Sequence, residues 1–136
     1  MSSLVKRRVL CAEPHEDTCA FIVSLLAREG HEVRSAGTMR ECLAIATSER
    51  FDLFMLNDDF VDGSNIELCK RLRALTPETP ILFFSSAAFE SDRQRAFEAG
   101  AVSYLTKPAD ILEIVQTVNA IFNGRGVVAR RDAERP

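Results

Sequence analysis

Five strand-like segments alternate with five amphipathic segments along this chain of 136 residues. The predicted strands cover residues 8–12, 31–35, 53–56, 81–84 and 102–105. Most of them are apolar on both faces, as strands buried in a parallel sheet are. The alternation predicts an α/β fold of three layers, in which helices cover both faces of one five-stranded parallel sheet.

The segments between the strands carry apolar side chains at helical spacing. The predicted helices begin near residues 18, 38, 64, 91 and 110. Thr38 with Glu41, and Ser64 with Glu67, have the spacing of capping boxes, and Asp110 should cap the last helix. The second helix is predicted to bury Met39, Cys42, Leu43 and Ala46.

The composition is that of one globular domain. Hydrophobic residues make up 46% of the chain and charged residues 27%, and the length suits a single domain. The net charge of -3 argues against direct nucleic-acid binding through bulk positive charge. We expect a domain over residues 1–123 and a linker or flexible C-terminal tail over residues 124–136.

Sequence features that mark export or membrane insertion are weak. The apolar run of residues 9–12 is too short for a signal peptide, and no run approaches the ~20 residues of a membrane span. The four cysteines show no C-x-x-C spacing, so reduced and mostly buried thiols are expected. We therefore expect a cytoplasmic protein that does not contact membranes.

Polar residues follow four of the predicted strands. They are Glu13-Pro14, Asn57-Asp58-Asp59, Ser85-Ser86 and Lys107-Pro108. In open parallel sheets the functional site lies at the carboxyl ends of the strands. An acid, a hydroxyl and a lysine gathered there would suit a phosphate together with a divalent cation.

Four stretches carry a resemblance to a known family. They are residues 8–13 (RVLCAE), 51–57 (FDLFMLN) with 62–64 (DGS), 80–86 (PILFFSS) and 99–108 (AGAVSYLTKP). The last is the most specific, because an aromatic residue follows Ala-Gly-Ala and stands three positions before Lys-Pro. Over about residues 7–123 the chain resembles the receiver domain of two-component response regulators. This resemblance implies a flavodoxin-like fold with strand order 2-1-3-4-5 and a non-enzymatic role in phosphorelay signal transduction.

The resemblance also implies roles for individual residues. Ser85 matches the switch hydroxyl of the family, and Tyr104 matches the aromatic residue that moves with it. Lys107 matches the lysine that holds the phosphoryl group, and its bond to Pro108 is commonly cis in the family. Glu13 matches the first of two acids that bind Mg²⁺.

Two positions depart from the family pattern. Pro14 stands where the second metal-binding acid is expected, and Asn57 stands where the phospho-acceptor aspartate is expected. A carboxamide is a poor nucleophile, so Asn57 should not form an acyl phosphate. Glu13 and the Asn57 carbonyl oxygen would bind Mg²⁺ weakly or not at all. We therefore expect an atypical receiver, without a cofactor, that is not phosphorylated at residue 57.

Asp58 is a weak candidate for a substitute acceptor. Side chains alternate along a strand, so the neighbour of Asn57 should point to the opposite face, although the rule loosens at the end of a strand. We do not expect Asp58 to take the acceptor role.

Two alternative functions remain open at this point. The chain could be an ordinary phosphorylated receiver that carries an Asp-to-Asn substitution at residue 57, although this leaves Pro14 unexplained. It could also be a flavin- or nucleotide-binding enzyme, because fold alone does not determine function. Glu13-Pro14 would be a poor phosphate cradle for such an enzyme.

The resemblance further implies an output surface made by the fourth helix, the fifth strand and the fifth helix. Arg93, Phe97 and Tyr104 are its candidate residues. Phe is usually buried, which would put Phe89 and Phe97 in the core and leave Arg93 and Tyr104 exposed. The expected partners are proteins, namely a histidine kinase, an output domain, another signalling protein or a second copy of the chain.

Overall fold

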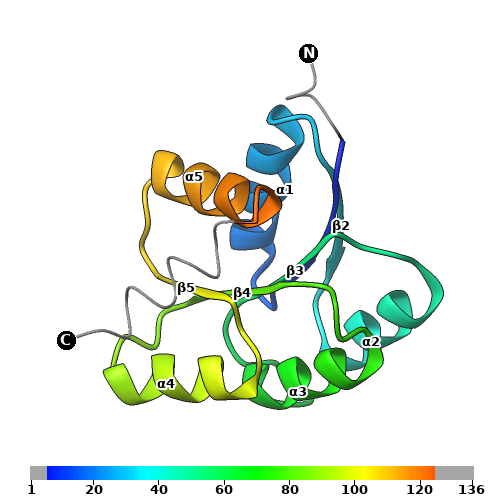
Figure 1. Cartoon of the computed structure of the whole chain (residues 1–136), viewed down its shortest axis with the longest axis vertical. Coiled ribbons are helices and arrows are strands. Elements are labelled where there is room, and N and C mark those ends of the chain that lie inside the picture. The colour runs from blue at the N-terminus through cyan, green and yellow to red at the C-terminus, as the bar shows by residue number, and fades with distance from the viewer. Residues whose placement is uncertain (1–5, 125–136) are drawn as a thin grey trace.

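The computed structural model describes residues 6–124, which form a five-stranded parallel sheet (Figure 1). The strand order is β2-β1-β3-β4-β5, as the resemblance implied. The strands are β1 (Arg8–Ala12), β2 (Glu32–Ala36), β3 (Leu53–Leu56), β4 (Ile81–Ser85) and β5 (Ser103–Thr106). Each is joined to the next by a helix, so the predicted flavodoxin-like (βα)₅ fold is confirmed. The expected tail lies almost wholly outside the described residues.

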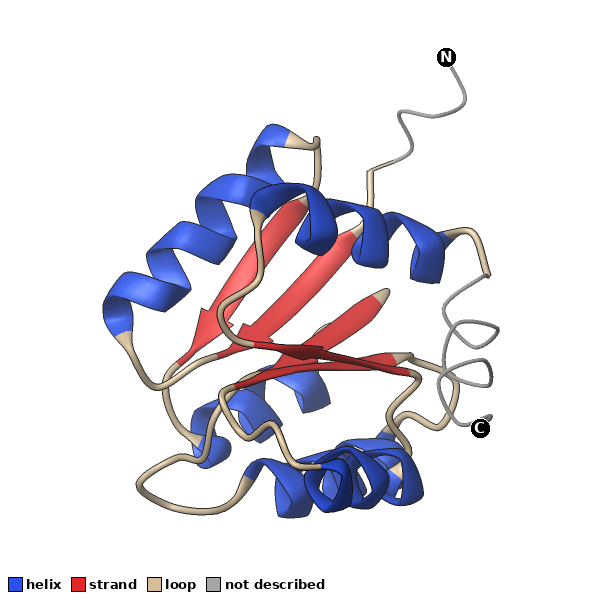
Figure 2. Ribbon diagram, turned by 90° about the vertical axis from the view of Figure 1, so that its left-hand side faces the viewer, coloured by secondary structure: helices blue, strands red, loops and turns tan. Residues whose placement is uncertain are grey.

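Helices cover both faces of the sheet, which makes three layers (Figure 2). They are α1 (Glu16–Arg28), α2 (Met39–Ser48), α3 (Asn65–Leu75), α4 (Glu90–Ala99) and α5 (Ile111–Phe122). Helices α1 and α5 lie on one face, and α2, α3 and α4 lie on the other. Within residues 6–124 no helix is long and apolar enough to cross a membrane.

The two faces of the sheet bury separate hydrophobic clusters. Side chains alternate along each strand, so Phe54 and Phe83 face α2, α3 and α4, whereas Met55 and Leu82 face α1 and α5. All four are 0–1% exposed. The apolar strands therefore bury both faces of the sheet, as their sequence predicted.

Local capping sets the start of three helices. The side chains of Thr38, Ser64 and Asp110 each accept a hydrogen bond from the backbone N–H three residues later. Such caps satisfy backbone donors that the helix leaves free. All three N-caps were predicted from the sequence, but the Glu41 carboxylate accepts from the Gly37 N–H rather than from that of Thr38, so it does not close the predicted capping box.

Several predicted boundaries and burials need correction. Strands β2, β4 and β5 each end one residue later than predicted, because Ala36, Ser85 and Thr106 still pair with a neighbouring strand. Helix α1 begins at Glu16 rather than near residue 18. Helix α2 buries Met39, Cys42 and Ala46 as predicted, but its fourth buried residue is Ile45, while Leu43 is only partly buried.

Candidate functional site at the carboxyl edge of the sheet

The polar residues at the end of β4 and just after β1, β3 and β5 meet at one edge of the sheet. Parallel strands place all their carboxyl ends on the same side, so residues up to 94 positions apart in the chain come into contact. The group is Glu13, Asn57, Asp58, Ser85 and Lys107. Asn57, Glu13 and Ser85 are 0–2% exposed. The structure thus brings together residues predicted at this edge, and it turns Asp58 toward Ser85 and Lys107, which strand alternation did not predict.

Asn57 directly follows β3 and is completely buried. Its Nδ2 donates a hydrogen bond of 2.5 Å to Oε1 of Glu13. Its backbone is held by a bond from Asn57 N–H to the carbonyl of Ala12, 3.0 Å, and by Asn65 Nδ2, which donates to the Asn57 carbonyl. The Oδ1 atom accepts no hydrogen bond from the described residues. The side chain therefore acts as a donor toward the acid rather than as a second acid.

Both oxygens of the Glu13 carboxylate have partners. Besides Asn57, Oε1 accepts a hydrogen bond from Lys107 Nζ at 3.0 Å. Oε2 accepts one from the backbone N–H of His15 and lies 3.0 Å from its Nδ1. A buried carboxylate needs such partners to remain charged. The backbone and the ring of His15, two residues along the chain, thus supply two of these partners.

Lys107 places its ammonium group between two carboxylates. Nζ lies 3.0 Å from Glu13 Oε1 and 3.0 Å from Asp58 Oδ2. The lysine side chain is only 17% exposed, and Nζ lies 5.3 Å from the centre of the Phe84 ring. The Lys107–Pro108 peptide bond is cis, as the resemblance implied.

Asp58 points into the site, contrary to the expectation from strand alternation. Its Oδ1 accepts hydrogen bonds from Ser85 Oγ at 2.9 Å and from the Ser86 N–H at 2.8 Å. Strand β3 ends at Leu56, so the backbone has left the sheet before Asp58 and alternation no longer decides its direction. Burial raises the pKa of Asp58, but the bonds from Ser86, Lys107 and Ser85 outweigh it and lower that pKa.

In this arrangement these residues leave few oxygens free for a divalent cation. The Glu13 carboxylate is engaged on both oxygens, and the Lys107 ammonium already stands between Glu13 and Asp58. Asn57 Oδ1 offers one neutral oxygen, whereas Mg²⁺ is usually held by carboxylates. In the described part of the chain no three His, Cys, Asp or Glu side chains are placed to hold a metal ion.

Tyr104 lies beside the site and is buried. Only 8% of it is exposed, its ring stacks on Phe83 with centroids 5.8 Å apart, and its hydroxyl donates to the Ala87 carbonyl at 2.6 Å. Burial raises the pKa of the phenol, partly offset by a hydrogen bond with Ser85. The expectation that Tyr104 is exposed was wrong, because it fills the space between Phe83 and α4.

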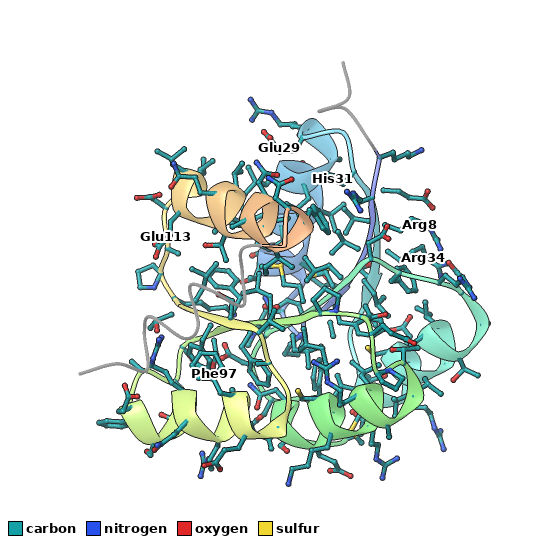
Figure 3. All side chains as sticks on the ribbon, viewed as in Figure 1. Arg8, Glu29, His31, Arg34, Phe97 and Glu113 are labelled. Carbon is teal, nitrogen blue, oxygen red and sulfur yellow. The ribbon has the colours of Figure 1, made fainter. Side chains whose placement is uncertain are left out.

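Of the two phenylalanines expected in the core, Phe97 agrees with that expectation and Phe89 does not. Phe89 is 77% exposed at the N-terminal end of α4, although it was expected in the core. Phe97 packs against the core from α4, on the side of that helix toward the sheet (Figure 3). The Arg93 guanidinium lies 5.7 Å from the Phe97 ring centre and 5.4 Å from that of Tyr104. Arg93 therefore covers Tyr104 from the solvent side.

A cavity opens beside these groups. Asp58, Ser85, Ser86, Asp92, Arg95 and Tyr104 contribute to its lining. It connects the carboxyl edge of the sheet to the start of α4. Ser86, whose N–H and hydroxyl both reach Asp58, was noted in the sequence only as a neighbour of Ser85.

Comparison with known proteins places this geometry in a family. Residues 9–119 match the family described as the response regulator receiver domain. The chain belongs to the response regulator receiver domain family. The predicted family is thus confirmed.

Individual relatives agree with this result. The transcriptional regulatory protein PrrA of Mycobacterium tuberculosis is 32% identical over 127 residues, which cover 93% of this chain and 54% of PrrA. The regulatory protein PhoP of Bacillus subtilis is 30% identical over 92% of this chain and 52% of PhoP. The chain therefore spans about half the length of the curated relatives it matches.

Solved structures support the fold independently. A CheY-like receiver domain protein from Methanospirillum hungatei superposes with a TM-score of 0.84 at 22% identity. The match covers 89% of this chain and 97% of that one. At this identity the likeness establishes the fold of the chain.

Proposed function

We propose that this receiver domain is an atypical member that regulates by protein–protein interaction and is not phosphorylated at residue 57. The observation that carries the proposal is Asn57, which directly follows β3 and directs its amide nitrogen at Glu13. An acyl phosphate requires a carboxylate oxygen as nucleophile, and the carboxamide supplies none. The ammonium of Lys107 is likewise engaged by two carboxylates of the protein itself.

The proposal is tested by exposing the protein to acetyl phosphate and MgCl₂ and measuring its intact mass. We expect no phosphoryl adduct on the wild-type chain. Asn57→Ala serves as the matched control, because it removes the side chain at the acceptor position and should give the same spectrum. A mass increase of one phosphoryl group, mapped to Asp58 or another residue of the site, would contradict the proposal.

The proposal includes a weak or absent Mg²⁺ site. Ligands that bind the folded state raise its melting temperature. We expect millimolar MgCl₂ to leave the Tm of the wild type unchanged relative to the same ionic strength of NaCl. A clear, saturable rise in Tm would show that Glu13 and Asn57 bind the ion after all.

The alternatives give different results in simple measurements. An ordinary receiver with an introduced Asn57 should regain phosphorylation at full rate in Asn57→Asp, despite Pro14. A flavin-binding enzyme should purify with visible absorbance near the flavin bands. The family match favours a signalling regulator over an enzyme, and we propose a cytoplasmic setting without direct nucleic-acid contact.

We further propose that the partner surface includes Arg93, Phe97 and Tyr104. Because Tyr104 is buried under Arg93, its contribution is to shape the surface, while exposed Phe89 extends it. Arg93→Glu and Tyr104→Ala should each weaken binding to a protein partner or self-association. Asn57→Ala should leave that binding nearly unchanged. The reverse pattern would place the working site at the carboxyl edge of the sheet.

A further inference from the structure

Asp58 is the one anion that contacts Ser85, Ser86 and Lys107 together within the described residues. Oδ1 accepts hydrogen bonds from the Ser85 hydroxyl and the Ser86 N–H, and Oδ2 accepts one from the Lys107 ammonium. A hydroxyl, a backbone N–H and an ammonium converging on one point form an anion-binding site. The side chain of residue 58 fills that site from within the protein.

The same anion is connected to Tyr104 through a short series of contacts. Ser85 Oγ, which donates to Asp58, accepts a hydrogen bond from the Ala87 N–H at 3.1 Å. The carbonyl of Ala87 in turn accepts the Tyr104 hydroxyl at 2.6 Å. The loop after β4 is therefore tied to Asp58 at residues 85 and 86, and to Tyr104 at residue 87.

The charges around Asp58 favour its ionised form. The Lys107 ammonium contacts this carboxylate directly. The Ser86 N–H and the Ser85 hydroxyl also point the positive ends of their dipoles at it. The carboxylate side chain is 23% exposed, so water reaches one side of it without displacing these partners. A neutral side chain at residue 58 would leave the ammonium shared with Glu13 alone.

We propose that Asp58 is a built-in anionic ligand of the pocket, which holds the loop after β4 and the buried Tyr104 in one conformation without a covalent phosphoryl group. This inference deepens the proposed function, since it names what keeps the domain in a single state. A ligand that belongs to the protein itself is always present, so it would keep the loop after β4 in one conformation instead of allowing it to change with a bound or covalent group.

Tyr104 provides a site-specific measurement, because it is the single tyrosine of the chain and the chain has no tryptophan. We compare acrylamide quenching of its fluorescence in the wild type, in Asp58→Asn and in Asp58→Ala. Release of the loop should expose Tyr104 and increase its quenching constant about twofold in both variants. Asp59→Asn is the matched control: it removes the same charge one residue away, from a carboxylate that accepts instead from the Asn65 N–H.

Inorganic phosphate, added without divalent cations and against an equal ionic strength of NaCl, tests the site itself. In Asp58→Ala we expect phosphate to reduce the quenching of Tyr104 toward the wild-type value. Wild type and Asp59→Asn should not respond. Urea unfolding of each variant shows that it is folded. If Asp58→Ala does not fold, Asp58→Asn serves for the quenching comparison, and Asp58→Ser, whose shorter side chain leaves space at the donors, serves for the phosphate test.

Unchanged quenching in folded Asp58→Asn and Asp58→Ala would overturn the role of Asp58 in holding Tyr104. Absence of any phosphate effect in folded Asp58→Ala would overturn the anion site. A phosphoryl adduct on the wild-type chain would instead defeat the proposed function, and it is detected by mass rather than by fluorescence. Failure of one proposal is therefore distinguishable from failure of the other.

Discussion

At the scale of single residues, Asn57 shows how an amide in place of a carboxylate changes a site. An aspartate there would stand against Glu13 as a second negative charge, and like charges at such distance repel unless a cation joins them. The amide instead donates to Glu13 and removes the need for a bound cation. In the function we propose, this amide both stabilises the buried acid and leaves the end of β3 without a nucleophile.

Asn57→Asp should make the domain phosphorylatable, but slowly. The variant regains a carboxylate nucleophile, while Pro14 still provides no second metal ligand, and a metal ion assists phosphoryl transfer by neutralising charge. Adding Pro14→Asp should increase the rate several-fold. The measurement is the time course of intact mass with acetyl phosphate and MgCl₂. Equal rates for the single and double variants would disprove this account of Pro14.

Cys19 is predicted to be the most reactive thiol. Its hydrogen bond with Cys11 lowers the pKa of Cys19 to about 6, against burial, which raises it. Burial raises the pKa of Cys42 to about 12 and that of Cys69 to about 11, and Cys11 is fully buried. Thiolates are the reactive species, so iodoacetamide at neutral pH should label Cys19 about tenfold or more faster than the others.

Peptide mass mapping after brief labelling identifies the modified cysteine. Cys11→Ala should slow the labelling of Cys19, because the thiol that donates to its thiolate is lost. Cys42→Ala is the control and should leave the rate at Cys19 unchanged. Labelling that is spread evenly over the four cysteines would contradict the prediction.

At the scale of secondary-structure elements, Gly100 and Arg73 join the ends of two helices. Gly100 follows α4 with φ of 123°, a conformation that L side chains rarely adopt. The Arg73 guanidinium, from the last turn of α3, donates to the carbonyls of Gly100, Pro77 and Thr79. A Cβ at residue 100 would lie 2.8 Å from Arg73 Nε.

Gly100→Ala should therefore reduce the free energy of unfolding by about 1–3 kcal/mol. Both the backbone conformation and the contact with Arg73 oppose the added methyl group. Urea unfolding measures the change. Gly37→Ala is the matched control, since the added Cβ would come no nearer than 4.0 Å to the Glu41 side chain. An equal effect of the two substitutions would show that neither strain nor contact is special to residue 100.

At the scale of the whole molecule, the ionised Asp58 couples stability to pH. Its pKa is lowered on folding from an ordinary value of 3.8, because Ser86, Lys107 and Ser85 outweigh the effect of burial. A group with a lowered folded-state pKa stabilises the protein above its unfolded-state pKa. That contribution is lost as the pH falls below about 3.8 through the folded-state value.

Asp58→Asn should accordingly lower the free energy of unfolding by about 1–2 kcal/mol at pH 7, the size expected for hydrogen bonds to a charged group that water partly reaches. The difference between wild type and variant should shrink as the pH is lowered from 4 to 3. Urea unfolding of both proteins over pH 7 to 3 measures it. A difference that stays constant over this range would exclude ionisation of Asp58 as its source.

The sequence by itself determined the elements of the fold and the edge of the sheet where the site lies. Apolar spacing and caps such as Ser64 are local properties, so a short window of residues predicts them. The position of Asn57 and Lys107 at the carboxyl edge followed from their place after a strand. The strand order and the cis bond at Pro108 came from the family resemblance, and the structure agrees with both.

Only the tertiary structure decided where the side chains at the end of a strand point and what covers them. Asp58 binds Ser85 and Lys107, which lie 27 and 49 residues away, after the backbone has left β3 and its alternation. Tyr104 is buried because its ring stacks on Phe83 and lies beneath Arg93, whereas Phe89 stands exposed at the N-terminal end of α4. Such outcomes depend on the meeting of distant segments, which local spacing does not encode.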